Sequence, residues 1–281
     1  MIDKTTPSAD ALAWFGRFRS ACLRIAAEIA EMPPAKRAEV VGDGAGGDRT
    51  VHIDLLAEDI VIESLKEAAA ENDGLTLVSE EVGEASMGAG GLPIVVIDPI
   101  DGSLNAKRGL PYFATSIAVA DGPTMGDVTL GYVYDYGTGN EFTAEAGRGA
   151  WLNGRPMAQV APQDALRVVA LEGAYPHRLA HAALELGEAR RLRMIGALAL
   201  SLCVTAAGWA DGMAGLGGGR SVDVAAGQLI ARECGAHVAT IDEPLDDYPL
   251  DVTSRRFMVA CANPDHAVML ERAVQAARDA D

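Results

Sequence analysis

Apolar residues recur at helical spacing in two segments near the start of the chain. Residues 10–31 form the first segment, and Pro33-Pro34 ends it. Residues 53–71 form the second, with apolar side chains on or near one face. The glycine-rich segment 40–50 between them predicts a loop. The chain is therefore expected to open with two amphipathic helices.

Apolar runs of strand length follow, separated by glycine, asparagine and aspartate. They predict strands at 75–81, 92–97, 114–121, 128–135 and 140–146, and a hairpin at Asn153-Gly154. A second glycine-rich segment, at 87–91, predicts a loop. This part of the chain is therefore expected to form a strand meander.

Beyond Pro162 the predicted strands and helices alternate. Strands are expected at 166–173, 191–196, 237–242 and 255–262, and helices at 177–187, 197–212, 221–236 and 264–279. The predicted fold class is α/β with α+β layering, in which helices and sheets stack. A boundary near residue 160 divides it into an α+β half, 1–160, and an α/β half, 161–281. The two halves are expected to pack as one catalytic unit.

Composition and charge restrict the partners. Hydrophobic residues make up 49% of the chain and aromatic residues 5%, so Ala, Val, Leu and Ile are expected to build the core. The formal net charge of −17 disfavours nucleic acids and anionic membranes. An anionic substrate would need local cations, which bound metal ions can supply. No apolar stretch reaches 18 residues and no secretory signal is visible, so we expect a cytoplasmic protein.

The cysteines and histidines carry little functional signal. The cysteines form no CxxC pair and are expected to be small buried residues, at positions 22, 203, 234 and 261. The five histidines do not cluster at ligand spacing. His177 and His181 are four residues apart on a predicted helix, where a surface position is expected.

Carboxylates stand at the ends of three predicted elements. Glu80 and Glu81 follow a strand, Asp98 and Asp101 follow another, and Asp223 opens a helix. Mg²⁺ prefers oxygen ligands, usually a few carboxylates together with water and substrate phosphate. The carbonyl of Ile100 would be an additional oxygen ligand between the two aspartates.

An anion-binding turn is expected directly after these aspartates. Gly102 allows the backbone to approach an anion closely, and Ser103 begins a predicted helix whose N-terminus favours phosphate. Each feature alone has an ordinary explanation: a surface Glu-Glu pair, a helix N-cap or a simple turn. Their occurrence together after apolar elements points to phosphoryl chemistry.

At these residues the chain resembles the inositol monophosphatase superfamily of Mg²⁺-dependent, lithium-sensitive phosphatases. The family's signatures read approximately GEE, DPIDGTxN and WDxAAG. Here they stand as Ser79-Glu80-Glu81, as DPIDGSLN at 98–105 and as VDVAAG at 222–227. The resemblance implies the sugar-phosphatase fold with αβαβα layers. Within the superfamily the chain looks most similar to archaeal-type dual fructose-1,6-bisphosphatase/inositol-1-monophosphatases.

The resemblance also implies roles for individual residues. The implied metal ligands, for two or three Mg²⁺ ions, are Glu80, Asp98, Asp101 and Asp223, with the carbonyl of Ile100. Ser103 and Asp54 are implied to orient the attacking water, near Glu80. The backbone at Gly102 and Ser103 is implied to hold phosphate, and Gly196 and Ala197 to shape the substrate pocket.

This sequence departs from the family pattern at several positions. Ser79 replaces a glycine, Val222 a tryptophan and Ala197 a serine. Leu216 falls near a position where some inositol phosphatases keep a glutamate. Gly46 stands where archaeal relatives keep an aspartate, so a third metal ion would depend on Asp43 or Asp48.

The expected substrate is fructose 1,6-bisphosphate, an inositol monophosphate, or both. A second phosphate would need a cation, for which Arg191, Arg193 and Arg220 are candidates. Arg220 is the best of these because it lies three residues before Asp223, and Tyr175 could contact the sugar. Alternatives are a phosphatase acting on histidinol phosphate or 3′-phosphoadenosine 5′-phosphate, and a non-catalytic sugar-phosphate-binding protein. The resemblance also implies a homodimer.

Overall fold

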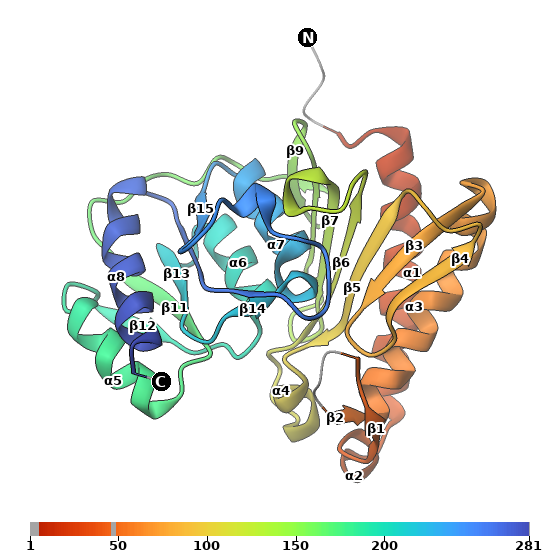
Figure 1. The fold of residues 1–281 in the computed structure, drawn as a ribbon, viewed down its shortest axis with the longest axis horizontal. Helices are drawn as coiled ribbons and strands as arrows, with labels where there is room; N and C mark the ends of the chain where they lie inside the picture. Colours follow the sequence, from red (N-terminus) through yellow and green to blue (C-terminus); the bar gives the residue numbers. More distant parts are fainter. Residues whose placement is uncertain (1–5, 46–48, 281) are drawn as a thin grey trace.

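The computed structural model describes residues 6–45 and 49–280, which form five alternating layers of helices and sheets (Figure 1). The helices of the three helical layers are α1 (Ala9–Glu31) with α3 (His52–Glu71), α6 (Leu198–Ala206) with α7 (Ser221–Glu233), and α5 (Pro176–Glu185) with α8 (Ala267–Arg278). The first pair covers the outer face of the larger sheet, the second lies between the sheets, and the third covers the smaller sheet. The predicted αβαβα layering is confirmed.

Within the described residues the larger sheet has eight strands in the order β10-β9-β8-β7-β6-β5-β3-β4. Their bounds are β3 (Gly74–Ser79), β4 (Gly83–Gly88), β5 (Ile94–Asp101), β6 (Ala114–Ala120), β7 (Val128–Asp135), β8 (Glu141–Glu145), β9 (Gly149–Leu152) and β10 (Arg155–Pro156). Only β3 and β5 pair in parallel among these described strands.

The smaller sheet has five strands in the described chain, in the order β12-β11-β13-β17-β15. Their bounds are β11 (Val168–Glu172), β12 (Arg191–Arg193), β13 (Gly212–Gly215), β15 (His237–Thr240) and β17 (Met258–Cys261). The two sheets fall on either side of residue 160, near the predicted boundary. The remaining short elements are β1 (Val40–Asp43), β2 (Arg49–Val51), β14 (Gly219–Arg220), β16 (Arg255–Arg256), α2 (Pro34–Arg37), α4 (Ser103–Arg108) and the 3₁₀ turns η1 (Met125–Asp127), η2 (Leu245–Asp247) and η3 (Pro264–His266).

Two loop predictions were wrong in part, because strands occupy 40–43 and 49–51 of the first segment and 87–88 of the second. Strands β1 and β2 form an antiparallel ribbon where a loop was expected at 40–50. Strand β4 extends to Gly88 and pairs along its length with β3, although 87–91 is glycine-rich. The glycine-rich composition of both segments disfavours strands. Hydrogen bonds to a neighbouring strand nevertheless stabilise the extended backbone there.

The DPIDGS motif, predicted to bind metal, also differs from the prediction in its local structure. Asp98 and Asp101 lie within β5 rather than after it. The register between β5 and β6 is interrupted between these two aspartates, where Pro99 has no N–H to donate. This irregularity allows a central strand to contain a proline and to turn its two carboxylates out of simple alternation.

Close packing of small residues holds the middle layer against the larger sheet. A side-chain carbon at Gly131 of β7 would lie 2.7 Å from the carbonyl oxygen of Ala226 in α7. One at Gly227 would lie 2.9 Å from the Leu202 side chain of α6. The alanine-rich, aromatic-poor composition therefore lets α7 approach both its sheet and its neighbouring helix.

Two further predictions concern the cysteines and the presence of a membrane-spanning helix. All four cysteines lie in the described part of the chain and are buried without disulfides, as predicted. No described helix combines the length and hydropathy needed to cross a bilayer.

Candidate active site

A pocket of about 530 Å³ opens between the two halves of the molecule and contains nearly all the predicted site residues. Ten of these residues line it, namely Asp54, Glu80, Asp98, Ile100, Asp101, Gly102, Ser103, Gly196, Arg220 and Asp223. Ala197 is buried beside the pocket. A larger cavity of about 790 Å³, beside Trp209 at the end of α6, contains none of them.

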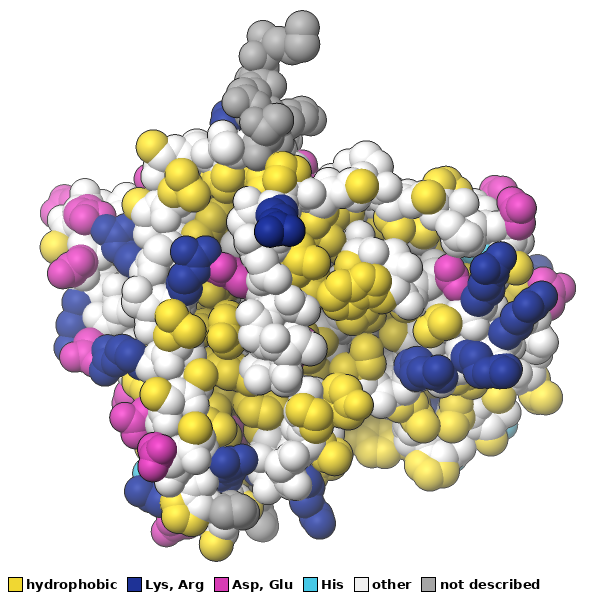
Figure 2. Space-filling view, turned by 180° about the vertical axis from the view of Figure 1, so that it is seen from behind, with side chains coloured by type: hydrophobic (Ala, Val, Ile, Leu, Met, Phe, Trp, Pro, Cys, Tyr) yellow, Lys and Arg dark blue, Asp and Glu magenta, His cyan; other side chains and the backbone are white. Residues whose placement is uncertain are grey.

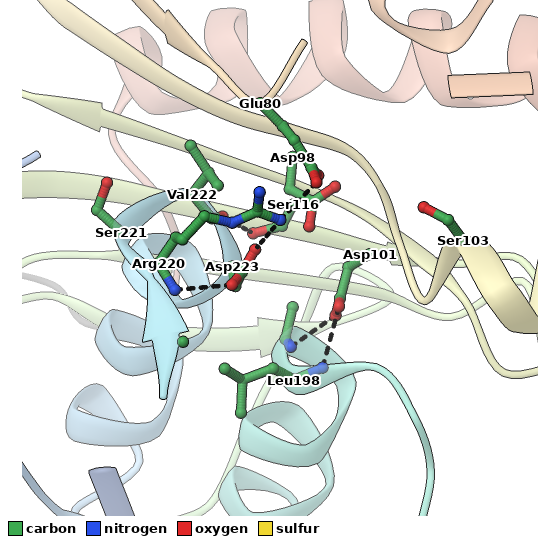
Figure 3. Close-up of polar contacts among 12 residues, drawn as sticks. Glu80, Asp98, Asp101, Ser103, Ser116, Leu198, Arg220, Ser221, Val222 and Asp223 are labelled. Carbon is green, nitrogen blue, oxygen red and sulfur yellow. Dashed lines mark hydrogen bonds and ion pairs between the residues drawn. The ribbon is translucent and has the colours of Figure 1, made fainter. Parts of the chain in front are cut away.

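Three carboxylates converge in this pocket. Glu80 follows β3, Asp98 lies in β5 and Asp223 lies in the first turn of α7. Each contributes an oxygen atom, and these atoms lie within 4.8 Å of one another (Figure 3). This is a donor set for a hard divalent cation.

The electrostatics of the cluster favour a cation. Burial raises the pKa of Asp98 well above its ordinary value, and the neighbouring Glu80, Asp101 and Asp223 charges raise it further. Burial also raises the pKa of Glu80, against the opposing effect of Arg220. Carboxylates buried this close together repel one another, so a positive charge between them is stabilising.

Arg220 provides one such positive charge. Its guanidinium group pairs with Glu80 and lies 3.4 Å from Oδ1 of Asp223 (Figure 3). Only 6% of the residue is exposed. The side chain predicted to bind a second phosphate therefore points at the carboxylates.

Asp101 makes different contacts from the three clustered carboxylates. Its Oδ1 accepts a hydrogen bond from Leu198 N at 3.0 Å, and its Oδ2 accepts one from Ala199 N at 2.7 Å. These N–H groups belong to the unpaired first turn of α6. Each carboxylate oxygen has a second lone pair, so Asp101 remains able to act as a ligand.

The turn after Asp101 is built on a glycine that no other residue could replace without strain. Gly102 has φ +89°, and a side-chain carbon there would lie 2.8 Å from the carbonyl oxygen of Tyr112 and 3.0 Å from that of Gly196. Ser103 then begins α4, and its hydroxyl donates to the carbonyl of Ile100 at 3.0 Å. The turn therefore packs against the loop that carries Gly196.

Asp54 approaches the same turn from α3. Burial raises its pKa to about 7, although Lys107 and a hydrogen bond with Ser103 oppose this rise. The Lys107 ammonium lies 4.0 Å from Oδ2 of Asp54. Asp54 and Ser103 therefore line the same part of the pocket, while the Ser103 hydroxyl itself donates to the Ile100 carbonyl.

Sequence reasoning missed Glu172, a buried carboxylate in the pocket wall. It ends β11 and accepts hydrogen bonds from Gly196 N at 3.0 Å and from the Ser201 hydroxyl at 2.5 Å. Burial raises its pKa to about 7. The signal was visible, because Glu172 follows an apolar strand as Glu80 does.

A second missed carboxylate explains one departure from the family pattern. Glu58 of α3 is fully buried, and its Oε1 accepts hydrogen bonds from the Ser79 hydroxyl and from Val82 N. Ser79 thus ties the turn containing Glu80 to α3. Leu216 is also fully buried and does not line the pocket.

Two of the three arginines predicted to bind a second phosphate lie away from the pocket. Arg191 and Arg193 are exposed on edge strand β12 and do not line the pocket. Figure 2 shows Lys and Arg side chains gathered at the right end of the rear face, the end that holds the smaller sheet. Arg255, which sequence reasoning missed, lines the pocket, as does the exposed Tyr175.

The residues proposed for a third metal ion are only partly described. Gly46 and Asp48 lie outside the described residues, and Asp43 ends β1. The backbone N–H of Ala45 donates to the carbonyl of Glu81 at 2.9 Å, so this ribbon reaches the carboxylate turn. His177 and His181 are both exposed, as predicted.

The chain is similar to known proteins over most of its length. A fructose-1,6-bisphosphatase/inositol-1-monophosphatase from Archaeoglobus fulgidus is 33% identical over 247 residues, covering 86% of this chain and 91% of the relative. Nus factor SuhB from Vibrio cholerae is 35% identical over 202 residues, covering 68% and 71%.

Solved structures of other proteins have a similar fold. A crystal structure of an inositol monophosphatase–fructose 1,6-bisphosphatase has a TM-score of 0.75 at 27% identity and covers 90% of this chain and 98% of that one. The extragenic suppressor protein SuhB from Bartonella henselae has a TM-score of 0.73 at 25% identity, covering 95% and 97%. A model of the inositol monophosphatase family matches residues 17–280, and the chain therefore belongs to this family.

Proposed function

We propose that this protein is a Mg²⁺-dependent phosphomonoesterase acting on a small sugar or cyclitol phosphate. The observation that carries the proposal is the convergence of Glu80, Asp98 and Asp223 in one pocket beside the turn at Gly102-Ser103. The relatives named as fructose-1,6-bisphosphatase/inositol-1-monophosphatase support it.

Glu80, Asp98 and Asp223 would hold the first metal ion, with Asp101 and the Ile100 carbonyl completing sites for two or three ions. The donor set fits Mg²⁺ because every donor is an oxygen and the buried carboxylates repel one another. When bound, the ions supply Lewis-acid activation of water and neutralise charge on the phosphoryl oxygens.

Residues of the chain would position the attacking water, the phosphate and the leaving group. The Ser103 hydroxyl would hold the attacking water, and the deprotonated Asp54 carboxylate would accept the hydroxyl proton, with Glu80 nearby. The backbone N–H groups at Gly102 and Ser103 would bind phosphate oxygens, and Lys107 adds positive charge on the same side of the pocket. The loop at Gly196 and Ala197 would shape the space for the leaving group.

We favour fructose 1,6-bisphosphate over an inositol monophosphate. Leu216 is buried, apolar and not part of the pocket lining, so the side chain at position 216 would not bind a ring hydroxyl. Arg255 lines the pocket and offers a cation to a second phosphate, whereas Arg191 and Arg193 do not line it. Tyr175 at the same pocket would contact the sugar.

We also propose that residues 1–160 and 161–281 act as one catalytic unit, because both contribute to the pocket and share a hydrophobic core. A homodimeric state remains a proposal from the family resemblance, and a cytoplasmic location remains a proposal from the sequence. Light scattering during gel filtration tests the first.

The activity test is a panel of phosphate esters with and without Mg²⁺. Purified protein would be incubated with fructose 1,6-bisphosphate, inositol 1-phosphate, histidinol phosphate and 3′-phosphoadenosine 5′-phosphate, and released phosphate measured. We expect Mg²⁺-dependent release, fastest from fructose 1,6-bisphosphate. Faster release from either of the last two esters would replace the substrate assignment, and no release from any would favour a non-catalytic binding protein.

A further inference from the structure

The side chain of Arg220 contacts two of the carboxylate groups that a metal ion would need. Its guanidinium group pairs with Glu80 and approaches Oδ1 of Asp223 at 3.4 Å, so it contacts two of the three clustered carboxylates (Figure 3). The residue is only 6% exposed. A guanidinium group and a divalent cation that contact the same carboxylates repel each other at such distances, so each weakens the binding of the other.

The backbone of Arg220 is fixed independently of its side chain. Its N–H donates to Oδ2 of Asp223 at 2.7 Å, and β14 pairs with β16, which places Arg220 opposite Arg255. The guanidinium group is therefore the part of Arg220 that can change position while the strand remains in place. Its long side chain makes such a change possible without rearranging α7.

The pairing of Arg220 with the carboxylates balances the negative charge of the cluster. Glu80 and Asp98 are carboxylates in a largely buried cluster, and leaving buried carboxylates without a counter-charge is strongly unfavourable. Arginine remains charged at any physiological pH, so its guanidinium can neutralise the cluster whenever no metal ion is bound. A lysine or a water molecule would not offer the same planar set of donors.

We propose that Arg220 is the internal counter-cation of the carboxylate cluster and competes with the divalent metal ion for Glu80 and Asp223. The inference rests on the proposed function, because it takes the cluster as the metal site. Metal binding then requires the guanidinium to leave these oxygens. The apparent affinity is reduced by the fraction of molecules in which Arg220 still occupies them. Arg220 thus sets how much metal the enzyme needs before the site is assembled.

Direct measurement of Mn²⁺ binding tests the competition without using activity. Free Mn²⁺ would be quantified by electron paramagnetic resonance during titration of the full chain, the R220Q variant and the R255Q variant. R255Q is the matched control, since it removes a positive charge from the same pocket at the cross-strand position. We expect R220Q to bind Mn²⁺ roughly tenfold more tightly and R255Q to change the affinity by less than about threefold.

Three outcomes would count against the proposal. Equal or weaker Mn²⁺ binding by R220Q overturns the competition while leaving the metal site intact. An equal gain in R255Q and R220Q also overturns it, because general electrostatics would then explain both. Absence of Mn²⁺ binding in all three proteins refutes the metal site itself, and the proposed function with it.

Thermal unfolding covers the case in which R220Q folds poorly. Without metal, R220Q should have a lower Tm than the unmodified protein, because the buried carboxylates lose their counter-charge. Saturating Mn²⁺ should restore its Tm close to that of the metal-loaded unmodified protein, and R220K should retain an intermediate Tm without metal. An R220Q protein that Mn²⁺ cannot stabilise would overturn the proposal, since the ion would then not replace the guanidinium.

Discussion

The backbone N–H of Ala199 donates a hydrogen bond to Oδ2 of Asp101 at 2.7 Å, joining residues 98 positions apart in the chain. The neighbouring Leu198 N–H donates to Oδ1 of the same carboxylate. Asp101 therefore connects the larger sheet to the first turn of α6. This gives a proposed metal ligand a structural role as well.

The Asp101→Asn variant should lose stability as well as turnover. Asparagine offers one acceptor oxygen, so one N–H of α6 would face an amide NH₂ group. We expect the free energy of unfolding to fall by about 1–3 kcal/mol, measured by urea denaturation. An unchanged unfolding free energy would show that the two hydrogen bonds contribute nothing.

The Asp223→Asn variant is the matched comparison, because its fold should survive. Asparagine caps a helix about as well as aspartate and can still accept the hydrogen bond from Arg220 N. We expect phosphate release with Mg²⁺ to fall by more than about 100-fold, since a charged ligand is lost. Far-UV circular dichroism should match that of the unmodified protein. Full Mg²⁺-dependent activity in this variant would contradict the metal assignment.

The buried Glu172 should make stability depend on pH. Its pKa is raised to about 7 in the folded state, whereas an unfolded glutamate titrates near about 4.3. The folded state therefore binds the proton more tightly, and stability falls as pH rises from about 4.3 to about 7 and then levels off. In Glu172→Gln this contribution should disappear, which urea unfolding at several pH values would reveal. Parallel pH profiles for the two proteins would refute the assignment.

Gly102 and Gly109 lie at the two ends of α4. Substituting each by alanine separates the cost of steric contact of the added side-chain carbon from the cost of a positive φ. Both have positive φ, but only Gly102 would place a side-chain carbon against other atoms. Gly109→Ala should cost about 1 kcal/mol, and Gly102→Ala distinctly more, with reduced turnover as the turn shifts. Thermal unfolding and kcat would be compared. Equal effects of the two substitutions would mean that the contacts of Gly102 are unimportant.

Arg255 should distinguish a bisphosphate from a monophosphate substrate. Arg255→Gln is expected to lower kcat/KM for fructose 1,6-bisphosphate roughly tenfold, because one charge-assisted contact to the second phosphate is lost. Hydrolysis of inositol 1-phosphate should change little. Arg191→Gln on the exposed edge strand β12 should alter neither rate. Equal losses on both substrates in Arg255→Gln would reject its role in selectivity.

The sequence alone determined the layered α/β fold and most of the carboxylates that meet in the pocket. The long helix α1 has a clear apolar periodicity, and the buried strand β5 begins with a continuous apolar run. These patterns are local and can be read directly. The motif residues were identifiable because glycine, proline and paired aspartates occur together at fixed spacing.

Only the tertiary structure decided which carboxylates form the cluster and which one accepts hydrogen bonds from α6. Asp98 joins Glu80 and Asp223, while Asp101 is bonded to α6, although both aspartates belong to one short motif. Arg220 lies among carboxylates because β14 pairs with β16 and Glu80 follows a distant strand. Short strands such as β13 and β14 owe their existence to such pairing rather than to their own sequence. Contacts between residues far apart in the chain depend on how whole layers pack, and no local pattern encodes them.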